Sequence, residues 1–200
     1  MSTPTHTHTF RELELKVDIP DYLIVEDHGN VRTNPSVYIE RLAKKRKFIF
    51  HSKLNKDSAG TTTYLESIKG ENHFFHVIYC YNTEKKELLD IFIRGHEEMH
   101  ALGICLDITK RERPDLYERI VENTNRISRV LPQLIQGIKN RGLPIGGNEI
   151  FADCGGFYAA KKKGFPVRKS YTQNNITNLE QQEIEIALNI LAMDKIKTDK

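Results

Sequence analysis

Several apolar stretches in the first part of the chain predict β-strands. Phe74–Tyr81, with the sequence FFHVIYCY, is dense in aromatic and β-branched residues, which is typical of a well-buried strand. Leu13–Val17 alternates between apolar and polar residues, and Phe48–His51 is a short apolar run, so each predicts a further strand. Asp57–Gly60 combines residues that favour turns and therefore predicts a loop.

Two helices are expected among these strands. Asn34 followed by Pro35 combines a capping residue with proline at the first helical position, which predicts a helix that ends near Lys47. The segment 84–103 predicts a second helix, because its inward positions recur at spacings of three and four. These positions are Leu89, Phe92, Ile93, His96, His100 and Gly103. Both histidines of this helix are therefore expected to face inward.

The chain beyond this helix is expected to be mainly helical. A helical insert is predicted over 109–141, beginning between Thr109 and Pro114 and bending or dividing near Asn123–Asn125. The glycines and proline of Gly142–Gly147 then predict a break.

Two more helices are predicted after this break. The first runs from Glu149 to Lys163, with Asn148 as its cap and Gly164 as its stop. The second covers Leu179–Met193.

Composition points to one folded domain. A chain of 200 residues with 38% hydrophobic residues can bury a substantial core, so a single α+β domain over residues 1–200 is expected, with a helical C-terminal half. Residues 1–9, which are rich in Thr and His, are expected to be disordered.

Charge and cysteine content argue against several partners. The net charge of +3 arises from 30 basic and 27 acidic residues, so attraction to nucleic acid or to an anionic membrane is weak. The sequence has no signal-peptide pattern and no run of 18 apolar residues, so neither export nor membrane anchoring is expected. Cys80, Cys105 and Cys154 are odd in number and far apart, which favours reduced thiols and a cytoplasmic location.

Residues 96–100, HEEMH, carry the strongest chemical signal. His96 and His100 are four residues apart, so on a helix both rings can bind one metal ion. H-E-x-x-H is a signature of zinc metallopeptidases, in which the Glu, here Glu97, is the general base. Glu98 is turned further from the histidines, and a surface position or a hydrogen bond to a neighbour of the metal is expected for it.

A catalytic zinc ion takes three protein ligands and keeps an open position. Glu149 and Asp153 are four residues apart at the start of a predicted helix and share one of its faces. Glu149 is therefore expected to be the third ligand. Asp153 is expected to accept the other ring N–H of a ligand histidine and so to orient it.

The pairing of HEEMH with NEIFAD, residues 148–153, resembles the glutamate-zincin metallopeptidases, including thermolysin-like enzymes. Three further features resemble the ImmA/IrrE-type metallopeptidases: a short chain without a signal peptide, a strand just before the active helix, and the spacing Glu149-x-x-Ala152-Asp153. This resemblance covers about a third of the chain. It implies a zincin-like domain with a small mixed sheet packed against the active helix, bound Zn²⁺, and a protein or peptide as substrate.

Two features depart from these families. Glu149 follows His100 by 49 positions, which is longer than expected for the ImmA/IrrE type, and the helical insert over 109–141 accounts for the difference. Gly155-Gly156 lies inside a predicted helix at a cost of about 2 kcal/mol relative to alanine, which suggests close packing against the active helix.

Three alternatives stay open from sequence. Phe74–Tyr81 is either an edge strand that pairs with an extended substrate, as in the family, or an interior strand. Tyr158, Arg168 and Tyr171 could stabilise an oxyanion, but residues of these types are more often packing or surface residues. The protein could also be a non-catalytic metal-binding or regulatory protein that uses the same site structurally.

Overall fold

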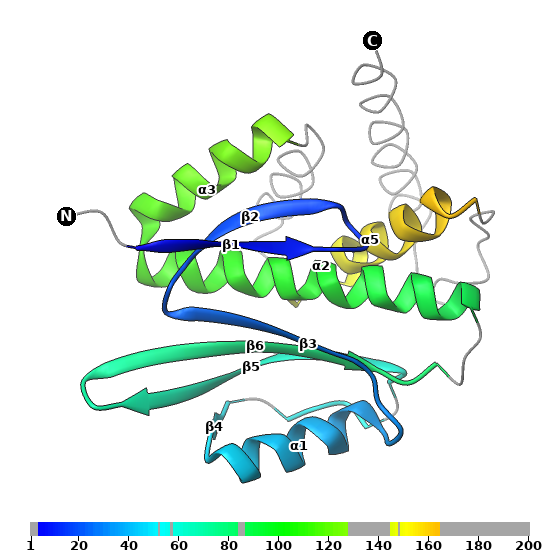
Figure 1. Ribbon diagram of the computed structural model, residues 1–200, viewed down its shortest axis with the longest axis horizontal. Helices are drawn as coiled ribbons and strands as arrows, with labels where there is room; N and C mark the ends of the chain where they lie inside the picture. The colour runs from blue at the N-terminus through cyan, green and yellow to red at the C-terminus, as the bar shows by residue number, and fades with distance from the viewer. Residues whose placement is uncertain are drawn as a thin grey trace.

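The computed structural model describes residues 4–51, 53–56, 58–83, 87–127, 145–147 and 149–164. A mixed sheet, a two-stranded hairpin and several helices pack together (Figure 1), so the predicted α+β fold class is confirmed. The predictions for 128–141, Asn148 and Leu179–Met193 lie outside the described residues.

The larger sheet has four strands in the order β3-β6-β5-β4. β3 (Leu23–Asn30) runs parallel to β6 (Asn72–Tyr81). β5 (Gly60–Lys69) is antiparallel to β6 and to the short β4 (Ile49–Phe50). The sequence pattern predicts β4 and β6 but neither β3 nor β5. β6 lies between β3 and β5, so the interior alternative holds for this strand and the edge alternative is wrong.

Alternate side chains of β6 pack on opposite faces of the sheet. The main core, which includes residues of α2, contains one set: Phe75, Val77, Tyr79 and Tyr81. A smaller core contains the other set together with side chains of α1 and β5: Ile78, Cys80, Ile39, Ala43 and Leu65. The sheet therefore separates α1 from α2, as Figure 1 also shows.

α1 (Pro35–Arg46) is the helix predicted after Asn34. The Asn34 side chain accepts a hydrogen bond from the Val37 N–H at 3.2 Å, which satisfies a free donor of the first turn. The helix ends at Lys47, which adopts a left-handed conformation with φ of 56°.

α2 (Glu87–Glu112) continues past its predicted end at Gly103. The helix goes on because its next turns bury further residues of the main core: Cys105, Leu106 and Ile108. Gly103 has a different role, since the backbone of Ile145 and Gly146 packs directly on it.

α3 (Pro114–Ile127) begins at the predicted proline and continues as one helix through Asn123–Asn125, so the helix is not divided there. α5 (Glu149–Lys162) matches its prediction to within one residue, and Gly164 follows with a φ of 81°. None of the helices in the described ranges combines the length and the apolar character needed to cross a bilayer.

An N-terminal hairpin joins β1 (Thr5–Phe10) to β2 (Leu15–Pro20). The expectation that residues 1–9 are disordered is therefore wrong for the described residues 4–9. The hairpin is ordered because its inward side chains belong to the main core: Phe10, Leu15, Val17 and Ile19. The predicted strand over Leu13–Val17 starts later than expected, as its first residues form the turn.

Glu26 of β3 is the centre of a polar network between the sheet and α1. Its carboxylate accepts hydrogen bonds from Arg46 at 2.7 and 2.8 Å, from His28 Nε2 at 3.0 Å and from His76 Nδ1 at 3.1 Å. Burial alone would raise the pKa of Glu26, but the bonds from the two histidines and the arginine outweigh it. The pKa of Glu26 is therefore held well below its usual range.

We predict that Glu26→Gln lowers the free energy of unfolding by about 2 kcal/mol near neutral pH, because charge-assisted bonds are lost at a mostly buried site. The folded-state pKa is lowered, so this stability is present above the unfolded-state pKa of about 4.3 and is lost as pH falls through the folded value. Urea unfolding should show a smaller difference in the free energy of unfolding between wild type and Glu26→Gln at about pH 3 than near neutral pH. The exposed Glu40→Gln is the control, and an equal effect of both substitutions would contradict the prediction.

Candidate metal centre

α2 presents His96 and His100 one turn apart on the same face. His96 donates its Nδ1–H to Asp153 Oδ1 at 2.9 Å, and His100 donates its Nδ1–H to the Gly146 carbonyl oxygen at 2.8 Å. Carboxylate and carbonyl oxygens only accept, so both Nδ1 atoms carry a proton. In the neutral rings, the Nε2 lone pairs are therefore free to bind a metal.

Glu149, in the first turn of α5, completes the predicted ligand set. Its Oε2 lies 3.4 Å from His96 Nε2 and its Oε1 lies 3.5 Å from His100 Nε2. These separations are long for hydrogen bonds, but two ligands about 2.1 Å from a tetrahedral ion are about 3.4 Å apart. The ligand atoms of the three residues all lie within 4.8 Å of one another. Two imidazoles and a carboxylate in this arrangement could hold a metal ion.

The surroundings of His96 attract positive charge. Burial disfavours its charged form, but the carboxylates of Asp153, Glu149 and Glu97 raise its pKa to about 10. The two histidines in turn hold the pKa of Glu149 well below its ordinary range. The side chain of Glu149 is 64% exposed, against 15% for His96 and 11% for His100, so the site opens to solvent beside Glu149.

Glycine lets α5 approach α2 closely. A Cβ atom at Gly95 would lie 2.5 Å from the Gly155 carbonyl oxygen, and one at Gly156 would lie 2.8 Å from the ring of Phe92. Real Cβ atoms do not come this close to other atoms, so the expected close packing of Gly155-Gly156 against the active helix is confirmed. This packing brings Asp153 into contact with the active helix.

Glu97 lies against β5. Its carboxylate is buried and accepts a hydrogen bond from the Thr62 hydroxyl at 2.5 Å. A Cβ atom at Gly60 would overlap the Glu97 carboxylate, so the glycine leaves the space that this side chain occupies. The negative charge of Glu97 helps to raise the pKa of His96.

Glu98 is not on the surface, and that part of its prediction is wrong. It is 2% exposed, and its carboxylate accepts three main-chain N–H bonds from the turn of the N-terminal hairpin. The donors are Arg11 at 3.0 Å, Glu12 at 2.8 Å and Leu13 at 3.1 Å. Despite these bonds, burial raises the pKa of Glu98 to about 7. Glu98 therefore anchors the hairpin to α2.

Asp107 is a positioning residue that sequence reasoning missed. Its carboxylate accepts the N–H of Ile145 at 3.2 Å and of Gly146 at 2.7 Å. The carbonyl oxygen of the same Gly146 accepts the hydrogen bond from His100 Nδ1–H. Gly103 permits this contact, since a Cβ atom there would lie 2.8 Å from Gly146 Cα. Asp107 and His100 are therefore linked through the main chain of a single residue, Gly146.

Tyr158 lies away from the three ligands. Its hydroxyl donates to Glu14 of the hairpin turn at 3.5 Å. It follows Glu149 by nine residues, which is about 13 Å along the helix axis. The structure therefore gives it no place at the metal centre, and Arg168 and Tyr171 lie outside the described residues.

Comparisons with protein-family models, with curated proteins and with solved structures found no match. The functional interpretation therefore depends on the geometry of the site and on its sequence motifs.

We predict that Asp107→Ala lowers the affinity for zinc by about 10- to 100-fold, because the carbonyl group that orients His100 is no longer held. Competition with a chromophoric chelator measures the dissociation constant. Asp115→Ala, at an exposed position of α3, is the matched control. An unchanged zinc affinity in folded Asp107→Ala protein would show that Asp107 does not position His100.

Proposed function

We propose that this protein is a zinc-dependent metallopeptidase. His96, His100 and Glu149 would hold the ion. Glu97 would be the general base. The supporting observation is that possible ligand atoms of three residues on α2 and α5 lie close together, and that the carboxylate of Glu97, next to His96 on α2, is buried. Two histidines and one glutamate with an open position are typical of catalytic zinc, and the resemblance of both motifs to glutamate zincins supports the same function.

The metal and the side chains around it would have different chemical roles. Zinc supplies a Lewis acid, which polarises a carbonyl and lowers the pKa of water to about 7. Glu97 would take the proton from the attacking water and return it to the leaving amine. The Thr62 hydroxyl donates to Glu97 Oε2, which orients the carboxylate and leaves Oε1 for the proton.

The main-chain direction of β5 suggests where a peptide substrate binds. The Tyr81 carbonyl oxygen accepts the Val31 N–H at 2.7 Å, so the main-chain groups of Tyr81 point toward β3. Gly60 is the cross-strand partner of Tyr81 on β5, and its main-chain groups therefore point to the opposite edge of that strand. Thr62, two residues further on, points the same way.

This edge is adjacent to the proposed general base. β4 pairs with β5 at Leu65 and Glu66, so no strand in the described ranges covers Gly60 or Thr62. An extended peptide can pair with the main chain at such an edge, and here it would lie beside Glu97. We therefore propose the first residues of β5, in place of the interior strand β6, as the substrate-binding edge.

The proposed substrate is a protein or peptide in the cytoplasm. Cys80, Cys105 and Cys154 are all buried free thiols, which supports a reducing compartment. The second candidate function is a non-catalytic or regulatory centre in which a metal only joins α2 to α5. The close glycine packing between these helices favours it, because a structural ion would suit such an interface.

We predict that Glu97→Gln retains about one zinc ion per chain and lowers the hydrolysis of peptide bonds by at least about 100-fold. Metal analysis and cleavage of an unfolded protein substrate measure these two properties separately. Glu118→Gln, at an exposed position of α3, is the control.

Full hydrolysis by the Glu97→Gln protein would exclude Glu97 as the base. Wild-type protein that gains stability from zinc but cleaves nothing would instead support the non-catalytic function.

A further inference from the structure

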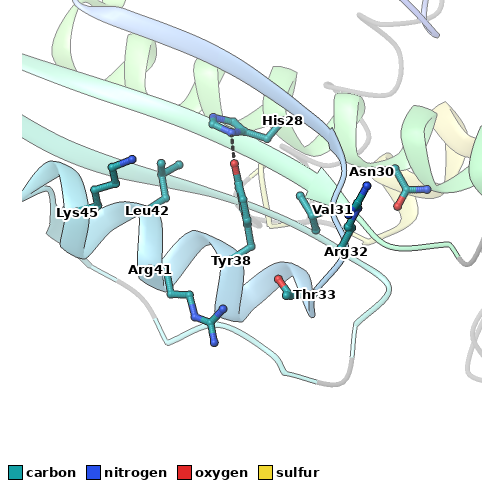
Figure 2. A pocket seen from close by; sticks show the side chains of 9 residues that line it. All are labelled: His28, Asn30, Val31, Arg32, Thr33, Tyr38, Arg41, Leu42 and Lys45. Carbon is teal, nitrogen blue, oxygen red and sulfur yellow. Dashed lines mark hydrogen bonds between the residues drawn. The ribbon is translucent and has the colours of Figure 1, made fainter.

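A cavity lies on the face of the sheet opposite to α2. It has a volume of about 600 Å³ and lies between α1 and the end of β3 (Figure 2). Ile78 and Cys80 of β6 pack on the α1 side, whereas Val77 and Tyr79 pack in the main core with α2. The sheet therefore separates this cavity from the metal centre.

Basic side chains dominate the polar lining of this cavity. They are His28, Arg32, Arg41 and Lys45, and no Asp or Glu side chain lines it. Within the described residues, neither arginine nor the lysine forms an ion pair with a carboxylate. Glu26, which lies behind His28, is already bonded to Arg46. Uncompensated cations around one cavity create a positive potential that favours an anionic ligand.

An ordered aromatic pair forms one wall. Figure 2 shows Tyr38 extending from α1 to His28, and its hydroxyl lies 2.8 Å from His28 Nδ1. His28 Nε2 donates to the Glu26 carboxylate at 3.0 Å, so Nδ1 of the neutral ring accepts the Tyr38 hydroxyl proton. The Glu26 network therefore holds Tyr38 in place before any ligand binds. Half-buried Leu42 adds apolar surface one turn further along α1.

We propose that this cavity binds a small organic phosphate. Arg32 would hold the phosphate, since guanidinium groups are among the usual protein donors to phosphate oxygens. Arg41 and Lys45, which Figure 2 shows directed away from Arg32, would add to the positive potential of the site. The organic part would lie against Tyr38 and Leu42. The cavity volume falls within the range of about 300 to 1,000 Å³ that is typical of small-molecule sites. This binding function is independent of the proposed peptidase activity.

The experiment is an NMR titration of the full chain with phenyl phosphate, in the presence and in the absence of zinc. We expect saturable shifts at Arg32, Tyr38 and Arg41 in both states. The double variant Arg32→Gln/Arg41→Gln should bind about tenfold more weakly or worse, because the charge-assisted contact of Arg32 and part of the positive potential are lost.

The matched control is Lys44→Gln/Lys47→Gln, which removes the same charge from exposed positions at the end of α1 outside the cavity. It should bind within about twofold of wild type. If both double variants bound the probe equally weakly, general electrostatic attraction would explain the binding, and the proposal would be overturned.

Three other results would also overturn it. The first is no saturable binding at about 10 mM phenyl phosphate. The second is a response that requires zinc and is confined to His96 and His100, which would place the probe at the metal centre. The third is tight binding of duplex DNA without any response to phenyl phosphate, which would assign the basic residues to nucleic acid. None of these readouts measures hydrolysis, so failure of the peptidase proposal leaves the test intact.

Discussion

The close approach of α5 to α2 is the constraint on which the metal centre depends. Gly95 and Gly155 meet without side chains between them, which lets Asp153 and Glu149 reach the histidines of α2. Zinc–ligand distances tolerate deviations of only about 0.2 Å. Even a side chain as small as a methyl group at this contact would push the two helices apart and would therefore move the ligand atoms away from one another. Main-chain packing sets this geometry before any metal binds.

Three consecutive residues of α2 connect the site to three different elements. His96 meets α5, Glu97 meets β5, and Glu98 holds the turn of the N-terminal hairpin. A helix turns about 100° per residue, so one short segment can serve all three directions. The proposed base and two proposed ligands thus share one element that is fixed on several sides, which is the rigid support that a preorganised site needs.

The candidate site could be predicted from sequence because its spacings are local. His96 and His100 are one turn apart on one helix, and Glu149 and Asp153 are one turn apart on another, so helical geometry alone places each pair on one face. Their convergence across 49 residues could not be derived from spacing. The same holds for Asp107, whose partners Ile145 and Gly146 reach it only in the folded chain.

The missed parts of the fold also depend on distant contacts. β3 contains Glu26, Asp27 and His28, and these polar residues hide the apolar pattern of a strand. The fold tolerates them because the charge of Glu26 is paired with Arg46 of α1. β1 is polar as well, and its hairpin is held by the buried Glu98 far along the chain. Local sequence patterns carry no information on partners of this kind.

X-ray absorption spectroscopy of the zinc-loaded protein tests the central claim most directly, because it reports the ligands of the ion without reference to activity. The account predicts two histidine nitrogens at about 2.0 to 2.1 Å and a carboxylate oxygen at about 2.0 to 2.2 Å from a single ion. The nitrogen signal should fall by half in His100→Ala. A zinc environment that does not change in His100→Ala, or that contains no histidine, would contradict the account.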